Sequence, residues 1–487
     1  MTDIETESQI ARALAAAQSV ALQQYILPAT TGVSVPTPPS IPLVAGAELA
    51  IAVPRGASCW WSVSEIAAAY RSGVITPLAL VDSLLARIER LDPQLNSFVF
   101  LDRKGARAAA ANPALPKGPL YGIPVGIKDV IDVAGMATTC HSQLRLNHIA
   151  DADARVVAQL RAAGAIIMGK LATHEFAIGG PSFDLPFPPA RNPWNIDYHP
   201  GGSSSGAGAA VAAGLVPLAI GTDTAGSVRN PASACGIVGL KPTQGALSCE
   251  GVFPLAWSLD HVGILARSVG DVDLAYRALA GSGADTHNPR IGFVRHFHEV
   301  DLPSDAETTN ALNAVAKALG AVDVVLPSLD DFALCNRVIL QSEGFAIHAD
   351  DLRDRPDAFA KRTRSALLPG MFVSAEDYVA ARRLKSRLTA AVDAVFANVD
   401  ILITASSMTP ACQIDDDAEI DRTYLRQARS VFNVTGHPAL AMMAGLSQSS
   451  LPLSVQFAAK RGDEATLCGL AAQWEQLMGG PQRPPIG

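Results

Sequence analysis

Two groups of serines stand in glycine-rich segments between residues 201 and 245. Ser203, Ser204 and Ser205 follow a glycine pair, and Ser227 stands alone in the segment DTAGSVR. No histidine occurs in this stretch, so these serines lack the base that Ser-His-Asp hydrolases use. The residues indicate nucleophilic serine chemistry with a different proton acceptor.

The residues around Ser227 are small enough to let a carbonyl approach. Ala219 and Ile220 are expected to end a strand, and residues 221–226 to form a tight turn whose N–H groups converge on one point. Converging N–H groups are what a developing oxyanion requires. Asp223 and Arg229 are expected to pair and stiffen this turn. The alternative is a purely structural turn serine.

The segment Gly202–Gly206 also fits the GxSxG pattern of the α/β-hydrolase nucleophile elbow, which needs a strand immediately before it. The preceding residues, NPWNIDYHP, are typical of a turn. We therefore interpret the match as accidental.

Lysine is the candidate base, and Lys128 lies in the apolar, strand-like run LYGIPVGIKDVIDVAG. Burial disfavours the charged form of a lysine. Lowering its pKa from about 10.4 to about 7.5 requires about 4 kcal/mol of differential desolvation. A salt-bridged lysine is the alternative for Lys128, and Lys170 and Lys241 remain rival bases.

Helical and strand patterns alternate along the chain and must position these residues. Helices are expected after the capping box of Ser62 and Glu65, after Thr76-Pro77, at 156–163 and through much of 300–400. Strands are expected at 96–101, 165–169, 290–294, 400–403 and 451–457, so the prediction is an α/β layered fold. An Ala-rich helix at 3–25 and a proline-rich linker form a predicted extension at 1–60, ahead of a catalytic domain at 61–487.

Composition excludes several classes of function. The chain has 487 residues, 49% of them hydrophobic, and a net charge of −8, which argues against nucleic-acid binding. Seven cysteines without a CxxC pair favour reduced thiols and a cytoplasmic location.

We expect no metal and no cofactor. No HExxH motif occurs, and the segment around His296 and His298 is interpreted as a strand that runs out to a surface turn. The acidic N-terminus is unlike a signal peptide. The apolar run at 41–54 is too short for a membrane span, and we expect these residues to form a buried strand or a packed arm.

Several segments together resemble the amidase signature family of serine hydrolases. They are GIPVGIKDV, RNPWN, PGGSSSGAGAA, GTDTAGSVRNPAS, CGIVGLKPTQG, WSLDHVGILARSVGD and the late blocks GHPAL, LPLSVQ and DEATL, in this order over about residues 62–480. The resemblance implies a single α/β domain whose mixed sheet is covered by helices on both faces.

The resemblance also implies a Ser-cisSer-Lys triad. Ser227 would be the nucleophile, Ser203 the bridging serine held by a cis peptide bond, and Lys128 the base, with an acyl-enzyme intermediate. It places the oxyanion hole on the N–H groups of Thr224, Ala225, Gly226 and Ser227. Ser204 and Ser205 would order the loop, with Asp223 and Arg229 as further support.

Three departures from the family pattern bear on substrate choice. Ala225 replaces a glycine beside the nucleophile, and residues 404–407 read TASS. Cys140 and His141 stand in an altered TTCHS segment, where His141 is either a pocket residue or an ordinary surface or core histidine. Residues 300–400 offer no arginine motif for a carboxylate, so an uncharged amide or carbamate is preferred.

We therefore expect a stand-alone hydrolase of small-molecule amides or carbamates, a homodimer with no nucleic-acid or membrane partner. The alternatives are the glutaminase-type subunit of a tRNA-dependent amidotransferase, a hydrolase of urea derivatives such as allophanate, and an inactive binding protein on the same fold.

Overall fold

The computed structural model describes residues 40, 56–281, 286–425 and 427–486. The predicted helix at 3–25, the proline-rich linker and the apolar run at 41–54 lie outside the described residues.

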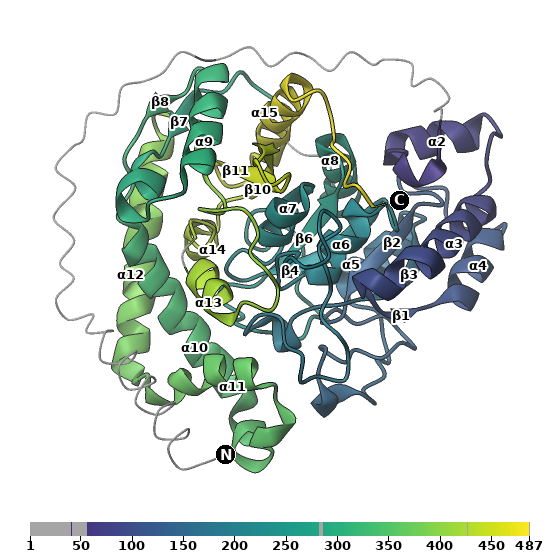
Figure 1. The fold of residues 1–487 in the computed structure, drawn as a ribbon, viewed down its shortest axis with the longest axis horizontal. Coiled ribbons are helices and arrows are strands. Elements are labelled where there is room, and N and C mark those ends of the chain that lie inside the picture. Colours follow the sequence, from purple (N-terminus) through teal and green to yellow (C-terminus); the bar gives the residue numbers. More distant parts are fainter. Residues whose placement is uncertain (1–39, 41–55, 282–285, 426, 487) are drawn as a thin grey trace.

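One mixed sheet of eleven strands runs through the described chain (Figure 1), in the order β1-β3-β2-β4-β6-β5-β10-β11-β9-β7-β8. Strands β3, β2 and β4 are mutually parallel, as are β9, β7 and β8, and the strands between them pair antiparallel. The strand bounds are β1 Phe98–Leu101, β2 Pro124–Lys128, β3 Ile166–Leu171, β4 Leu218–Asp223, β5 Val238–Lys241, β6 His261–Ala266, β7 Ile291–Phe293, β8 Val322–Asp323, β9 Ile401–Ala405, β10 Ala439–Leu446 and β11 Pro452–Ala459.

Helices cover both faces of this sheet. Helices α6 and α7 contact one another. Helix α6 packs on β2, β3, β4 and β6, and α7 packs on β5, β10 and β11, whereas α5, α8 and α15 form the other layer. Every residue of β2, β3, β4 and β6 is buried, as expected for strands covered on both sides. The predicted α/β/α architecture is confirmed.

The helix bounds are α2 Val63–Arg71, α3 Pro77–Leu95, α4 Arg103–Ala111, α5 Arg155–Ala162, α6 Ser205–Ala212, α7 Arg229–Cys235, α8 Val269–Ala280, α9 Ala306–Ala318, α10 Leu329–Asp354, α11 Lys361–Leu367, α12 Ala375–Phe396, α13 Asp417–Leu425, α14 Val431–Thr435 and α15 Glu464–Leu477.

Two long helices, α10 and α12, pack side by side outside the sheet (Figure 1). They come from the region 300–400, which the sequence predicts to be mostly helical. No helix among the described residues is both long enough and apolar enough to cross a membrane.

Local signals place several helix starts correctly. The Ser62 hydroxyl accepts from the Glu65 N–H while the Glu65 carboxylate accepts from the Ser62 N–H, which is the predicted capping box. Thr76 caps α3, with Pro77 at its first position.

Two local predictions are wrong. Strand β4 does not end at Ile220 but continues to Asp223, because Thr222 and Asp223 pair with β6. His298 is not in a surface turn: it is buried in a short π-helix, Phe297–Asp301, with its ring 5.3 Å from that of Phe293.

Candidate active site

The ends of two parallel strands bring the proposed base and the bridging serine together. Lys128 is the last residue of β2, and the pairing of Ile127 with Ile220 sets it beside the end of β4. Its Nζ lies 2.7 Å from Ser203 Oγ and donates to Thr222 Oγ1, also at 2.7 Å. The carboxyl ends of parallel strands are the usual place for sites in open α/β sheets.

Burial shifts Lys128 toward its neutral form. The side chain is completely buried, and this desolvation lowers the pKa of Lys128 to about 7, although the nearby carboxylates of Asp223 and Asp260 act in the opposite direction. A neutral amine near pH 7 can accept a proton from a hydroxyl.

The rival lysines are held by other partners. Lys170 Nζ forms a buried ion pair with Asp129 at 2.9 Å and also donates to Thr138 Oγ1. Lys241 Nζ donates to the carbonyls of Pro242 and His437 at 3.0 and 2.7 Å. Among the described contacts, only Lys128 of these three lysines reaches a serine of the catalytic segments.

The peptide bond between Gly202 and Ser203 is cis, as the family resemblance implies. His199 Nδ1 accepts the Gly201 N–H at 2.9 Å, and the Ser203 carbonyl accepts the His174 N–H at 3.1 Å. Burial lowers the pKa of His199 to about 3, so its ring stays neutral and Nδ1 remains an acceptor. Hydrogen bonds therefore fix the main chain both before and after the cis peptide bond.

Ser204 and Ser205 are buried and bond to main-chain carbonyls. Ser204 Oγ donates to the Thr222 carbonyl at 3.2 Å, and Ser205 Oγ to the Ala172 carbonyl at 3.5 Å. The Ser204 N–H also donates to the Ser227 carbonyl at 3.1 Å. The two serine segments are thus linked by their main chains.

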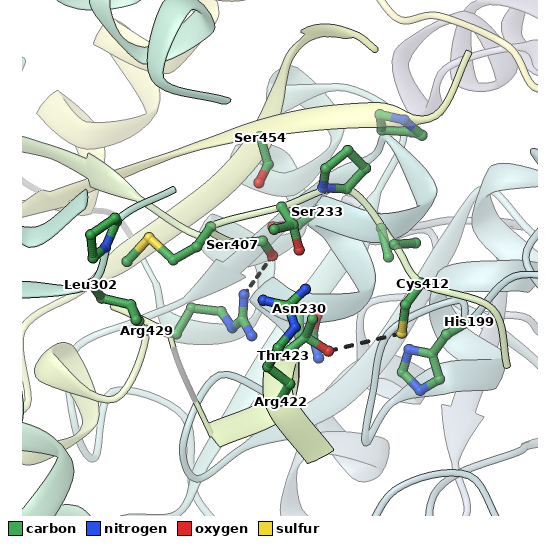
Figure 2. A pocket seen from close by; sticks show the side chains of 17 residues that line it. His199, Asn230, Ser233, Leu302, Ser407, Cys412, Arg422, Thr423, Arg429 and Ser454 are labelled. Carbon is green, nitrogen blue, oxygen red and sulfur yellow. Dashed lines mark hydrogen bonds between the residues drawn. The ribbon is translucent and has the colours of Figure 1, made fainter. Parts of the chain in front are cut away.

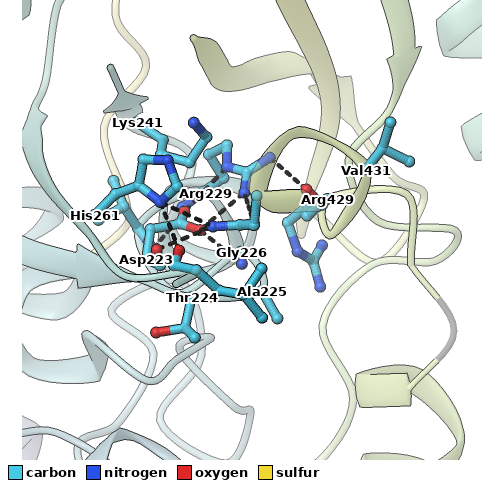
Figure 3. Close-up of polar contacts among 12 residues, drawn as sticks. Asp223, Thr224, Ala225, Gly226, Arg229, Lys241, His261, Arg429 and Val431 are labelled. Carbon is cyan, nitrogen blue, oxygen red and sulfur yellow. Dashed lines mark hydrogen bonds and ion pairs between the residues drawn. The ribbon is translucent and has the colours of Figure 1, made fainter. Parts of the chain in front are cut away.

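The predicted pairing of Asp223 with Arg229 is present behind the Ser227 turn (Figure 3). Arg229 Nη2 lies 2.8 Å and Nε 3.0 Å from the carboxylate, and both side chains are fully buried. Arg229 also donates to Gln456, Asn433 and the Arg429 carbonyl. Burial alone would raise the pKa of Asp223, but Arg229 holds it well below the usual value.

One of the four N–H groups predicted for the oxyanion hole is already used. The Gly226 N–H donates to Asp223 Oδ1 at 2.7 Å, so it is not available to an oxyanion. The N–H groups of Thr224, Ala225 and Ser227 have no acceptor among the described residues. Thr224, Ala225 and Ser227 therefore remain the candidates for the oxyanion hole.

Gly226 has a main-chain conformation and surroundings that favour glycine. Its φ is +121°, and an added Cβ would lie 2.7 Å from the side chain of Arg429. We expect Gly226→Ala to lower kcat/KM for an amide about 100-fold, since a displacement near 1 Å has that effect at a reacting centre. Gly270→Ala is the control, because nothing lies within 4 Å of its added Cβ. Equal activity of the two variants would contradict the prediction.

Ser227 opens onto a cavity of about 600 Å³. Gly202, Thr224, Ala225 and Gly226 line it beside Ser227, and the opposite walls come from 333–341, 361–366 and 417–430. A volume of this size suits a small organic ligand. Ser227 is partly exposed there, whereas Lys128 and Ser203 are buried beneath the surface.

Cys140 and His141 are not among the residues that line this cavity. His141 instead lines two other cavities, of about 430 and 10 Å³. His141 is buried, with Nε2 3.2 Å from the Phe187 carbonyl and its ring 5.2 Å from the Phe187 ring. Burial lowers the pKa of His141 to about 4 and raises that of the Cys140 thiol. Both residues have positive φ angles, 52° for Cys140 and 59° for His141.

Figure 2 shows the residues that line a second, smaller cavity of about 50 Å³. Asn230 and Arg429 line both cavities and form their shared wall. Arg429 Nη1 donates to the Ser406 carbonyl and to Ser407 Oγ, each at 2.7 Å. This guanidinium is therefore held by the protein.

The sequence did not indicate several residues that position the Ser227 turn. Thr224 Oγ1 donates to Asp260 at 2.6 Å, and Asp260 also accepts the N–H groups of Leu255 and Ala256. Asn336 on α10 donates to the Thr224 carbonyl at 3.3 Å. Asp260 lies in the WSLDHVG segment, a motif that could have indicated it, but Asn336 carries no sequence signal.

Comparison with known proteins agrees with this geometry. The model of the Amidase family matches residues 79–468. The chain belongs to the amidase signature family. It is accordingly an enzyme of a family that hydrolyses C–N bonds.

Relatives in this family differ in what they act on. The chain is 32% identical to a glutamyl-tRNA(Gln) amidotransferase subunit of Roseiflexus sp. (strain RS-1) over 479 residues, 87% of this chain and 98% of that protein. A chain from a vestigial protein complex bearing on the origins of an s-triazine catabolic enzyme is 31% identical with a TM-score of 0.80, covering 87% of this chain and all of that one. The 6-aminohexanoate cyclic dimer hydrolase, solved with its substrate, is 26% identical with a TM-score of 0.79, covering 88% and 100%.

Proposed function

We propose that this chain hydrolyses a linear amide through an acyl-enzyme on Ser227. The observation that carries the proposal is Lys128 Nζ, 2.7 Å from Ser203 Oγ, beneath the cavity onto which Ser227 opens. A lysine with a pKa of about 7 is matched to proton transfer near neutral pH.

The proposed reaction has two halves. Ser203 passes its proton to neutral Lys128 and takes the proton of Ser227, while Ser227 Oγ attacks the amide carbonyl. The C–N bond breaks when the departing nitrogen takes a proton back through Ser203. Water then attacks the acyl-enzyme by the same route, releasing the acid and restoring Ser227.

The N–H groups of Thr224, Ala225 and Ser227 would stabilise the oxyanion in both halves. Asp223 and Arg229 support this arrangement by fixing the turn. The Ala225 carbonyl accepts from Gln427 Nε2 at 2.6 Å, which holds the main chain of the residue that departs from the family pattern.

Glutamine is the first candidate substrate. Glutamyl-tRNA(Gln) amidotransferase subunits from several bacteria match nearly their full length to this chain, which supports the glutaminase-type hypothesis over a stand-alone enzyme. Under that hypothesis the chain acts together with other proteins of an amidotransferase complex.

A stand-alone hydrolase of larger amides is the second candidate. The cavity of about 600 Å³ exceeds what one glutamine side chain needs, and the similar 6-aminohexanoate cyclic dimer hydrolase acts on a larger amide. Carbamates and urea derivatives such as allophanate would use the same triad and belong in the same substrate panel.

Ammonia and amine release from a substrate panel tests the proposal. Purified protein would be assayed with glutamine, simple primary amides, secondary amides, a carbamate and allophanate. Turnover of glutamine only in the presence of the other amidotransferase subunits supports the first candidate, and turnover of other amides by the protein alone supports the second. Failure to hydrolyse any amide under either condition contradicts the proposed function.

We further propose residues 61–487 as one catalytic domain, a homodimeric assembly and a cytoplasmic location. The sheet includes strands from Phe98 to Ala459, which supports the first. All seven cysteines are unpaired, which supports a reducing compartment.

A further inference from the structure

The cavity in front of Ser227 is cationic, although the chain as a whole is acidic. Its lining includes four cationic side chains, Arg337, Lys361, Arg362 and Arg429, and only two acidic ones, Asp417 and Asp421. The net charge of the chain is −8. A cleft of opposite sign to the rest of the surface concentrates anionic ligands.

Two of these cations are engaged by the protein. Arg362 pairs with Asp417 at 2.6 Å and with Asp421 at 2.7 Å, so its guanidinium is shared between the two acidic side chains of the lining. Arg429 donates to Ser406 and Ser407. Both guanidinium groups are thus already bound by other residues of the chain.

Arg337 differs from Arg362 and Arg429 in its polar contacts. It is half-buried on α10, faces the cavity, and makes no hydrogen bond or ion pair with any residue that the structure describes. The side chain of Lys361, exposed at the same cavity, also has no described polar partner. A partly desolvated charge without a partner is costly unless a ligand completes it.

The position of Arg337 is set by its neighbour. Asn336 donates to the carbonyl of Thr224, which is part of the oxyanion turn. This turn of α10 therefore lies against the nucleophile's loop, and Arg337 projects into the same cavity as Ser227.

We infer that Arg337 binds a carboxylate of the substrate, with Lys361 as a second cation at the opening. The guanidinium fork matches a carboxylate with two parallel hydrogen bonds. The substrate class is then an amide that carries a carboxylate away from the scissile bond. This rests on the proposed amide hydrolysis, and it replaces the sequence-based preference for an uncharged substrate, which depended on the lack of an arginine motif in residues 300–400.

Matched substrate pairs test the inference. Succinamate, glutaramate and adipamate would be compared with butanamide, pentanamide and hexanamide, which lack the carboxylate. We expect the wild-type protein to favour at least one carboxylate over its neutral partner by about 10- to 100-fold in kcat/KM, and Arg337→Gln to remove this preference chiefly through KM. Arg337→Lys should restore part of it.

Arg383→Gln is the matched control, because Arg383 is exposed on α12 and outside the catalytic cavity. It makes the same change in charge and should leave the preference unaltered. An equal loss for charged and neutral amides in Arg337→Gln, or no preference in the wild-type protein, would overturn the inference while leaving amide hydrolysis intact.

A binding measurement separates this inference from the catalytic proposal. Thermal unfolding would be followed with succinate, glutarate and adipate. We expect at least one of them to raise the Tm of the wild-type protein and of Arg383→Gln, and not that of Arg337→Gln. If no dicarboxylate stabilises the wild-type protein more than Arg337→Gln and the paired amides show no preference, Arg337 does not bind a carboxylate.

Discussion

Replacing Ser227 with alanine is expected to abolish amide hydrolysis. Loss of a serine nucleophile lowers kcat on the order of 10⁴- to 10⁶-fold in serine hydrolases. The fold should be retained, since the side chain is partly exposed at the cavity and the bond from the Ser204 N–H to the Ser227 carbonyl does not involve the hydroxyl. The measurements are single-turnover kinetics and labelling by a fluorophosphonate, with mass spectrometry to locate the modified peptide.

Ser365→Ala is the control for this variant, because Ser365 lines the same cavity from α11. It should keep both turnover and labelling. Labelling of the Ser227→Ala protein at another serine, with turnover close to that of the wild-type protein, would show that Ser227 is not the nucleophile.

Replacing Lys128 with methionine should remove activity while making the protein more stable below neutral pH. The activity should fall on the order of 10³-fold or more, because Ser203 then has no proton acceptor. In the wild-type protein, kcat/KM should rise with pH through about 7, the pKa of Lys128, since only the neutral amine can accept the proton. The pH–rate profile measures this directly.

The stability effect follows from the direction of the same shift. The pKa of Lys128 is about 7 in the folded protein and 10.5 in the reference state, so the unfolded chain binds more protons between these values and stability rises with pH there. Below about pH 7 the lysine opposes folding by a few kcal/mol, and above about pH 10.5 this contribution is absent.

The test is the difference in free energy of unfolding between Lys128→Met and the wild-type protein, obtained from urea titrations at several pH values. The variant should gain most at pH 6 and least at pH 10. A difference that does not change with pH would mean that Lys128 does not titrate in this range, and the same result would remove it as the base.

Local sequence patterns were sufficient for many elements and for the type of chemistry. The caps at Ser62 and Thr76 mark helix starts because their hydrogen bonds join residues three positions apart. Apolar runs predicted the buried strands, and small residues around two serine sites predicted turns. These signals are short-range, so the sequence carries them in full.

Among the lysines, the choice of base depends on contacts between strands. Lys128, Lys170 and Lys241 are all fully buried at or near strand ends, and composition does not distinguish them. The parallel pairing of β2 with β4 brings Lys128 to Thr222 and the Ser203 loop, whereas Lys170 meets Asp129 on the adjoining segment.

The sequence by itself determined the family, the layered α/β class and the three residues proposed for the triad, because these reside in contiguous motifs. The tertiary structure decided that Asp223 occupies the Gly226 N–H, that His141 lies outside the lining of the catalytic cavity, and that Arg337 lines the same cavity as Ser227. Arg337 and Ser227 are separated by more than 100 positions, and no local pattern records which face of α10 meets the nucleophile. Only packing of α10 against the oxyanion turn, through Asn336 and Thr224, sets that relation.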